Sequence, residues 1–127
     1  MTQQGSSKIN SFRDLNIWKN GLLIAREVYL LTKKLPKEET FGLSSQMRRA
    51  AISVPSNIAE GRSRNSRKDF AQFLHIALGS LAELETQLFL TDDLYQDIKV
   101  DDVIRMIHEE QKMVMGMIKA LKLAPKS

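Results

Sequence analysis

The fold of this chain is decided by the stretch Phe41-Gly-Leu-Ser-Ser-Gln-Met-Arg-Arg-Ala-Ala-Ile-Ser-Val-Pro-Ser-Asn-Ile-Ala-Glu-Gly61. Apolar residues recur in it with the period of one helical face. They are Leu43, Met47, Ala50, Ala51, Val54 and Ile58. Pro55 interrupts the pattern, since a proline inside a helix removes a backbone hydrogen bond. Either one helix bends at Pro55, or Ser53 caps a new turn there. The unbroken apolar spacing favours the single bent helix, which Gly61 is expected to end in a left-handed conformation.

A second helix is predicted upstream of this stretch, over about residues 14–35. Ser11 or Asp14 is expected to cap its start, and Pro36 to stop it. It carries two apolar stripes: one holds Leu15, Trp18, Leu22, Ala25 and Tyr29, and the other Ile17, Ile24, Val28 and Leu31. A helix that is apolar over this width has more surface to bury than one groove.

Two more helices are predicted downstream. Ser66 is expected to cap the first, with Asp69 three residues later approximating a capping box, and this helix extends to about Thr91. Its inward stripe is Phe70, Leu74, Ala77, Leu81, Leu84 and Leu88. Asp101 or Asp102 is expected to cap the last helix, which ends at about Leu123. Its inward residues are Ile104, Ile107, Val114, Ile118 and Leu121, with methionines beside them.

The pattern as a whole predicts an all-α fold. No segment alternates with a period of two for long, so strands are not expected. Long amphipathic helices with short links predict an antiparallel up-and-down four-helix bundle over residues 12–123, with a disordered tail at 1–11 and a frayed end at 124–127. The surplus apolar stripes on the first and last helices predict a homo-oligomer. Gly79 and Ala82 add a strip of small residues that would suit a close helix contact, unless these positions are simply exposed.

The composition excludes several classes of functional site. The chain has 127 residues, no cysteine and a net charge of +4. Disulfides and thiolate metal sites are therefore excluded. No apolar run is long enough for a membrane span, so we expect a cytoplasmic protein without a membrane partner. The mild positive charge permits nucleic acid as a partner but does not require it.

The expected topology separates the charges. In an up-and-down bundle, the second link, the start of the first helix and the end of the last helix lie at one end. That end gathers Arg62, Arg64, Arg67, Lys68, Lys119 and Lys122. The other end holds acidic residues that Lys33, Lys34, Lys37 and Lys99 partly offset; they are Asp92, Asp93, Asp97, Asp101, Asp102, Glu38 and Glu39. The basic end is predicted to contact the phosphates of RNA or DNA. The alternative is that residues 62–68 form only a solvated turn.

Arg48 and Arg49 lie inside the helix that contains Pro55. The favoured interpretation is that they form interhelical ion pairs with Glu83 and Glu85. The alternative is that they contact phosphate, which adds them to the candidate nucleic-acid-binding residues.

No catalytic, metal or cofactor site is predicted. The two histidines, His75 and His108, lack the glutamate three residues earlier that di-iron bundles use. His108 also lacks the second histidine of the zinc-protease pattern. Asn57 and Glu60 are expected to form a small buried polar cluster of structural rather than catalytic type. We therefore expect a protein that is not an enzyme.

Three stretches resemble the motifs of a known family. They are Phe12-Arg-Asp-Leu-Asn-Ile-Trp18, the stretch 41–61 quoted above, and Phe70-Ala-Gln-Phe-Leu-His-Ile-Ala-Leu-Gly-Ser-Leu-Ala-Glu-Leu-Glu-Thr-Gln87. The family is that of small bacterial four-helix bundles found with intervening sequences in 23S ribosomal RNA genes. Accessory proteins of diversity-generating retroelements are relatives. The similarity covers about residues 12–121.

This resemblance implies a pentameric barrel and nucleic-acid binding, and, for the retroelement relatives, binding to a reverse transcriptase. The basic residues Arg48, Arg49, Arg62 and Lys68 resemble the family pattern. Two functions are therefore expected as alternatives. The first is an oligomeric bundle that binds structured RNA or DNA through its backbone. The second is a protein-interaction adaptor without direct nucleic-acid binding.

Overall fold

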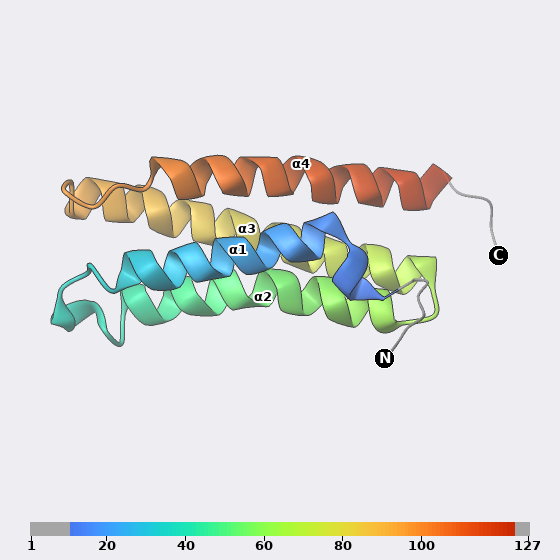
Figure 1. Ribbon diagram of the computed structural model, residues 1–127, viewed down its shortest axis with the longest axis horizontal. Helices are drawn as coiled ribbons and strands as arrows, with labels where there is room; N and C mark the ends of the chain where they lie inside the picture. Colours follow the sequence, from blue (N-terminus) through green and yellow to red (C-terminus); the bar gives the residue numbers. More distant parts are fainter. Residues whose placement is uncertain (1–10, 124–127) are drawn as a thin grey trace.

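The computed structural model describes residues 11–123, which form four long helices and no strand (Figure 1). The long helices are α1 (Asn16–Thr32), α2 (Leu43–Ser63), α3 (Arg67–Leu94) and α4 (Asp101–Leu123). Two short 3-10 helices, η2 (Phe12–Asp14) and η3 (Lys37–Glu39), precede α1 and α2. The all-α prediction is confirmed. Residues 1–10 of the predicted tail at 1–11, and the predicted frayed end at 124–127, lie outside the described residues, whereas Ser11 caps η2.

The four helices pack as neighbours in chain order. α2 contacts both α1 and α3, and α4 contacts both α3 and α1. In Figure 1, α3 runs from the end of α2 to the start of α4, so it lies beside α2 at one end of the molecule and beside α4 at the other. The link 64–66 lies at one end, and the links 33–42 and 95–100 lie at the other. We call these the arginine end and the opposite end. No described helix is long and apolar enough to cross a membrane.

The core is built mainly from the predicted inward stripes, but in α4 Ile104 and Leu121 are only partly buried, and Val103 is buried instead. Its largest fully buried apolar side chains come from all four helices. They are Ile24 and Val28 of α1, Met47, Val54 and Ile58 of α2, Leu74, Leu81, Leu84 and Leu88 of α3, and Ile107 of α4. Each large apolar side chain buried in this way contributes about 1.5–3 kcal/mol. In α1 the second predicted stripe faces the core, whereas Leu22 and Tyr29 of the first stripe are exposed.

The ends of α1 differ from the prediction. Ser11 caps η2 instead of α1, since the backbone N–H of Arg13 donates to Ser11 Oγ at 3.1 Å. Leu15 then precedes α1 without a side-chain cap. The helix ends at Thr32 rather than at about residue 35. The prediction followed the apolar pattern to Leu35, which is buried although it lies beyond the helix.

The stretch 41–61 forms most of one continuous helix. α2 passes through Pro55, which is buried within it, so the alternative of a new helix starting after Ser53 is wrong. The expected role of Gly61 as a left-handed end is also wrong. Gly61 is helical, its backbone stays out of the left-handed region, and α2 continues to Ser63. A Cβ atom at Gly61 would lie 2.5 Å from the Cβ of Phe73. Glycine is therefore needed here because α2 and α3 approach closely.

Candidate functional site

Three of the predicted arginines surround one hollow at the arginine end. Arg62, Arg64 and Arg67 line it. Its remaining lining is Asn65, Ser66, Leu15, Phe70, Met117 and Leu121, and its volume is about 480 Å³. No acidic side chain is among these residues. We call this site the arginine hollow. It combines guanidinium, amide and hydroxyl donors above an apolar floor, the donor types that bind phosphate oxygens.

The local sequence fixes the backbone of this hollow. α2 ends at Ser63, and Arg64 leaves it in an extended conformation (φ −79°, ψ 153°). Ser66 is also extended, and its Oγ accepts a hydrogen bond from the backbone N–H of Asp69 at 3.1 Å. The predicted N-cap of α3 is thus confirmed. Arg67 begins α3, where the positive end of the helix dipole adds to the attraction for an anion.

Arg64 is held by two contacts. Its Nη2 lies 3.0 Å from Oε2 of Glu60, and its guanidinium carbon lies 5.0 Å from the centre of the Phe73 ring. Both partners of the ion pair are about half exposed, so the pair itself contributes little stability. The stacking limits the positions of the guanidinium and leaves its other nitrogens available to a ligand.

The remaining predicted cations at this end lie outside the hollow. Lys68 follows Arg67 in the first turn of α3, and Lys119 and Lys122 lie in the last turns of α4. All three are exposed. The C-terminal end of α4 and the link 64–66 lie at the same end of the molecule (Figure 1). These lysines therefore lie at the same end as the hollow but are not part of its lining.

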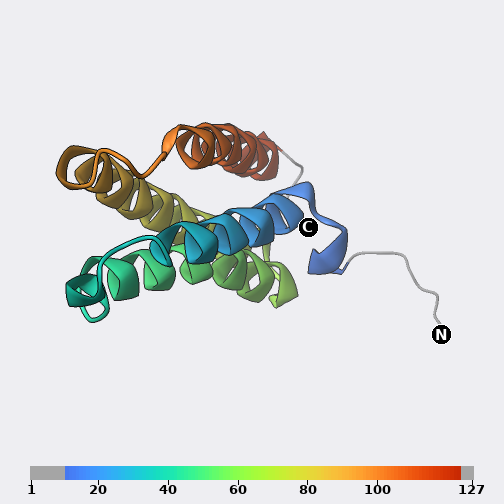
Figure 2. The same ribbon diagram turned by 60° about the vertical axis from the view of Figure 1, so that its left-hand side comes forward.

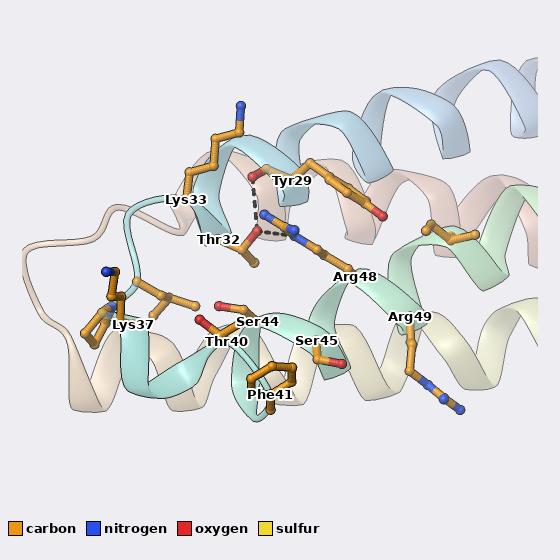
Figure 3. A pocket seen from close by; sticks show the side chains of 13 residues that line it. Tyr29, Thr32, Lys33, Lys37, Thr40, Phe41, Ser44, Ser45, Arg48 and Arg49 are labelled. Atoms are coloured by element: carbon orange, nitrogen blue, oxygen red, sulfur yellow. Dashed lines mark hydrogen bonds between the residues drawn. The ribbon is translucent and has the colours of Figure 1, made fainter.

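Arg48 and Arg49 do not form the predicted ion pairs. Arg48 Nε donates to Thr32 Oγ1 at 2.8 Å, and its guanidinium carbon lies 4.5 Å from the Tyr29 ring centre (Figure 3). Glu83 and Glu85 interact elsewhere: Glu83 accepts from Gln87, and Glu85 bonds to His108 and Gln111 of α4. The prediction failed because Arg48 faces α1, whereas Glu85 faces α4.

Arg48 and Arg49 line a second hollow, which we call the cationic hollow. It lies at the opposite end, between α1, α2 and the link between them, with a volume of about 580 Å³. Lys33 and Lys37 also line it, and no acidic side chain does. The other lining residues are Tyr29, Thr32, Leu35, Pro36, Thr40, Phe41, Ser44, Ser45 and Ile52. The predicted nucleic-acid-binding residues are therefore divided between the two ends.

The polar cluster predicted around Asn57 has different members. Asn57 Nδ2 donates to the backbone oxygen and to Oγ of Ser53, each at 2.8 Å. Ser53 Oγ also lies 2.8 Å from Ser80 Oγ of α3. Glu60 is exposed and pairs with Arg64 instead. Asn57 therefore joins α2 to α3 through serines, which agrees with a structural role.

Sequence reasoning missed a buried carboxyl group, that of Glu110. It is 0% exposed in the middle of α4. Asn20 Nδ2 of α1 donates to its Oε1 at 3.0 Å, while its Oε2 is buried without a hydrogen-bond partner among the described residues. Burial raises the pKa of Glu110 to about 7, although the hydrogen bond from Asn20 acts against this rise. The sequence feature that could have revealed this buried carboxyl is the position of Glu110 on the inward face of the helix, three residues after Ile107 and four before Val114.

Within residues 11–123, no three histidine, aspartate or glutamate side chains are placed to hold a metal ion. The arrangement that these residues do offer is electrostatic, with two anion-attracting hollows at opposite ends.

Replacing Ser66 by alanine is expected to destabilise the protein by about 1 kcal/mol, because the N–H of Asp69 loses its side-chain acceptor. Urea denaturation followed by circular dichroism measures this loss. Ser56→Ala is the matched control, since Ser56 is an exposed residue inside α2. An equal loss for both variants would contradict the capping role.

The fold and the two hollows define a small, basic, all-helical protein with anion-attracting surfaces. A family model described as the 23S rRNA-intervening sequence protein matches residues 13–116, and the chain belongs to this family. A comparison with curated proteins gave no match. Among solved structures, the chain is similar to a protein of unknown function from the S23 ribosomal protein family of Bacteroides thetaiotaomicron. The identity is 29%, the TM-score is 0.74, and the match covers 81% of this chain and 95% of the other.

Proposed function

We propose that this protein is a non-enzymatic antiparallel four-helix bundle that assembles into a homo-oligomer and binds structured nucleic acid through phosphates at its arginine end. The observation that carries the proposal is the convergence of Arg62, Arg64 and Arg67 on one hollow that no acidic side chain lines. The hollow contains no free aromatic face for stacking, because Phe70 is buried. The ligand is therefore a structured backbone, RNA or duplex DNA, rather than unpaired bases.

Structured RNA is the first ligand to test, because the family is named for intervening sequences of 23S rRNA. Each phosphate that an arginine neutralises releases a counterion, so affinity falls as salt rises. Lys68, Lys119 and Lys122 are exposed near the hollow and extend the attraction beyond it. At physiological ionic strength the screening length is about 8 Å, so charges at the opposite end do not cancel this field.

The proposed assembly is supported by apolar side chains that remain exposed on every helix. Those at least 44% exposed are Leu22, Leu23, Leu30, Phe41, Ile52, Ile76, Phe89, Leu90, Leu94, Met115 and Leu123. Exposed apolar side chains mark interaction sites where they gather into a patch. An assembly with like ends together, such as the pentameric barrel that the family resemblance implies, would repeat the arginine hollow around one rim and raise avidity.

The second candidate is an adaptor that binds a protein, such as a reverse transcriptase of a retroelement, without direct nucleic-acid binding. The observation that favours it is Phe41, whose side chain is 94% exposed beside the cationic hollow. An isolated aromatic side chain in water is typical of an interface residue.

Fluorescence anisotropy with a labelled RNA hairpin and with duplex DNA over a salt series tests the proposal. We compare the wild type with Arg62→Glu/Arg64→Glu/Arg67→Glu. The variant is expected to lose binding and, where duplex binding remains measurable, to reduce the salt slope by about 3. The matched control is Arg26→Glu/Lys99→Glu/Lys112→Glu, which changes the net charge equally at exposed sites away from the hollow.

If the triple-arginine variant keeps its helicity and its assembly, its loss of binding is due to lost ligand contacts and not to unfolding. Equal loss in the control variant would show that only net charge matters, and would contradict a site at the hollow. A wild type that binds neither ligand at low salt would leave the adaptor as the better function.

A further inference from the structure

We propose that the cationic hollow of one molecule docks an acidic surface on a second copy of the same chain. The acidic surface consists of Asp92, Asp93, Asp97 and Asp101, at the end of α3, in the following link and at the start of α4. This inference rests on the proposed assembly and goes further, because it states which two surfaces meet.

Within the described chain, the cations of the hollow are not paired, although Glu38 and Glu39 lie in the same link. Lys33, Lys37, Arg48 and Arg49 form no ion pair in residues 11–123. Arg48 is nonetheless held in place, with Nε on Thr32 and its guanidinium over Tyr29 (Figure 3). A guanidinium fixed in this way loses little further freedom when it binds a carboxylate.

The apolar part of the hollow indicates a protein partner. Phe41 is 94% exposed, and Tyr29 and Ile52 are also exposed. Together with Arg48 these residues have the composition of an interface hot spot, in which aromatic and arginine side chains carry most of the binding energy. A small anion would leave this apolar surface uncovered.

The acidic surface has the complementary composition. Its four aspartates are exposed and form no ion pair within residues 11–123, whereas the neighbouring Asp102 is paired with Arg105 at 2.7 Å. Phe89 lies one helical turn before Asp93 and is 54% exposed. Carboxylates and an apolar ring are therefore presented together, as the hollow requires.

The placement of the two surfaces determines how copies can meet. The hollow is built on α1, α2 and their link, and the acidic surface on α3, α4 and their link, at the same end of the molecule (Figures 1 and 2). The two links touch, since Tyr95 Oη donates to Glu39 Oε2 at 2.6 Å, but no ion pair joins the two surfaces within residues 11–123. The proposed contact is heterologous, because the hollow of one copy meets the acidic surface of the next, and the copies keep the same orientation. Such a contact closes into a ring if the rotation between copies permits.

Charge exchange tests the contact. One variant, Lys33→Glu/Lys37→Glu/Arg49→Glu, reverses the hollow but keeps the fixed Arg48. The other, Asp92→Lys/Asp93→Lys/Asp97→Lys, reverses the acidic surface. All six positions are exposed, so the fold is expected to remain, which circular dichroism checks. Each variant alone is expected to weaken assembly by about 100-fold or more in sedimentation velocity, because like charges then face each other.

The decisive experiment is to mix the two charge-reversed variants. Each variant retains one native surface and carries one reversed surface, so contacts between the two variants are complementary and contacts within one variant repel. An equimolar mixture is therefore expected to form complexes with alternating subunits in a 1:1 ratio, which native mass spectrometry measures; a closed ring of five subunits is not expected, because an odd ring cannot alternate. Recovery supports the proposed contact. A mixture that stays monomeric, or single variants that assemble as well as the wild type, would overturn it while leaving the assembly itself intact.

A wild type that is monomeric at all concentrations tested would instead overturn the proposed assembly and this contact with it. The variant Arg62→Glu/Arg64→Glu/Arg67→Glu is the control for general charge effects. It is expected to assemble like the wild type, because its substitutions lie at the arginine end.

Discussion

Replacing Gly61 by alanine is expected to destabilise the protein by about 2 kcal/mol. The added Cβ would lie 2.5 Å from the Cβ of Phe73, closer than two carbon atoms can approach. Because that atom is fixed to the backbone of α3, a side-chain rotation cannot relieve the clash, and α2 and α3 must separate. Overpacking of this kind costs about 1–3 kcal/mol, occasionally more. The higher helix propensity of alanine offsets part of this cost, by about 1 kcal/mol. Urea denaturation at fixed protein concentration measures the difference.

The chain offers two matched controls for this substitution. A Cβ at Gly79 or Gly116 would meet no atom within 4 Å. Alanine at either position is expected to stabilise the protein by up to about 1 kcal/mol, since each glycine lies inside a helix. The opposite signs at position 61 and at these two positions are the decisive result. Stabilisation by Gly61→Ala would show that α2 and α3 are farther apart than described here.

Replacing Glu110 by glutamine is expected to remove a loss of stability that the wild type shows between about pH 5 and pH 8. Burial raises the pKa of Glu110 in the folded protein from its ordinary 4.5 to about 7. The folded state therefore prefers the protonated carboxyl. Stability is full below about pH 4.5, falls as pH rises towards 7, and is level above it. The expected loss is about 3 kcal/mol, from about 1.4 kcal/mol for each unit of pKa.

The comparison requires a defined pH range and a neighbouring control. Glu39 and Glu85 have pKa values below their ordinary range because Tyr95 and His108 hydrogen-bond to their carboxylates, so their contribution is lost only below about pH 4.5. Glu109→Gln is the control, since Glu109 is the exposed neighbour of Glu110. Free energies of unfolding at pH 5, 6, 7 and 8 are measured for the three proteins. A Glu110→Gln variant with the same pH profile as the wild type would contradict this account.

Sequence periodicity predicted the helices but not the contacts that need a known rotation of each helix. The inward stripe and the Ser66 cap of α3 follow directly from the spacing of apolar residues and from helix capping. For α4, the predicted cap was wrong: Asp101 and Asp102 lie in its first turn, and Val100 precedes the helix. The partner of Arg48 could not be predicted, because facing α1 or facing α3 depends on how α2 is rotated. The predicted role of Gly61 as a helix end was wrong for a similar reason, since a glycine near a helix end is compatible both with a turn and with a close helix contact.

The candidate site was predicted in part. The three arginines around the link meet because the link is short and both helix ends are fixed. Arg48 and Arg49 are separated from them because α2 is a continuous helix between these positions. Glu110 was visible in the spacing of α4, but its sequence neighbours are polar and directed attention to exposed charge instead.

The stacking of Arg64 on Phe73 connects the ligand-facing surface to the helix contact at Gly61. A lineage that enlarged residue 61 would displace the ring and, in the same step, the guanidinium resting on it. A lineage that lost Arg64 would uncover one face of an aromatic ring. Natural variation at these three positions should therefore be inherited as a set, so a homologue without the glycine is expected to lack the aromatic–arginine pair as well.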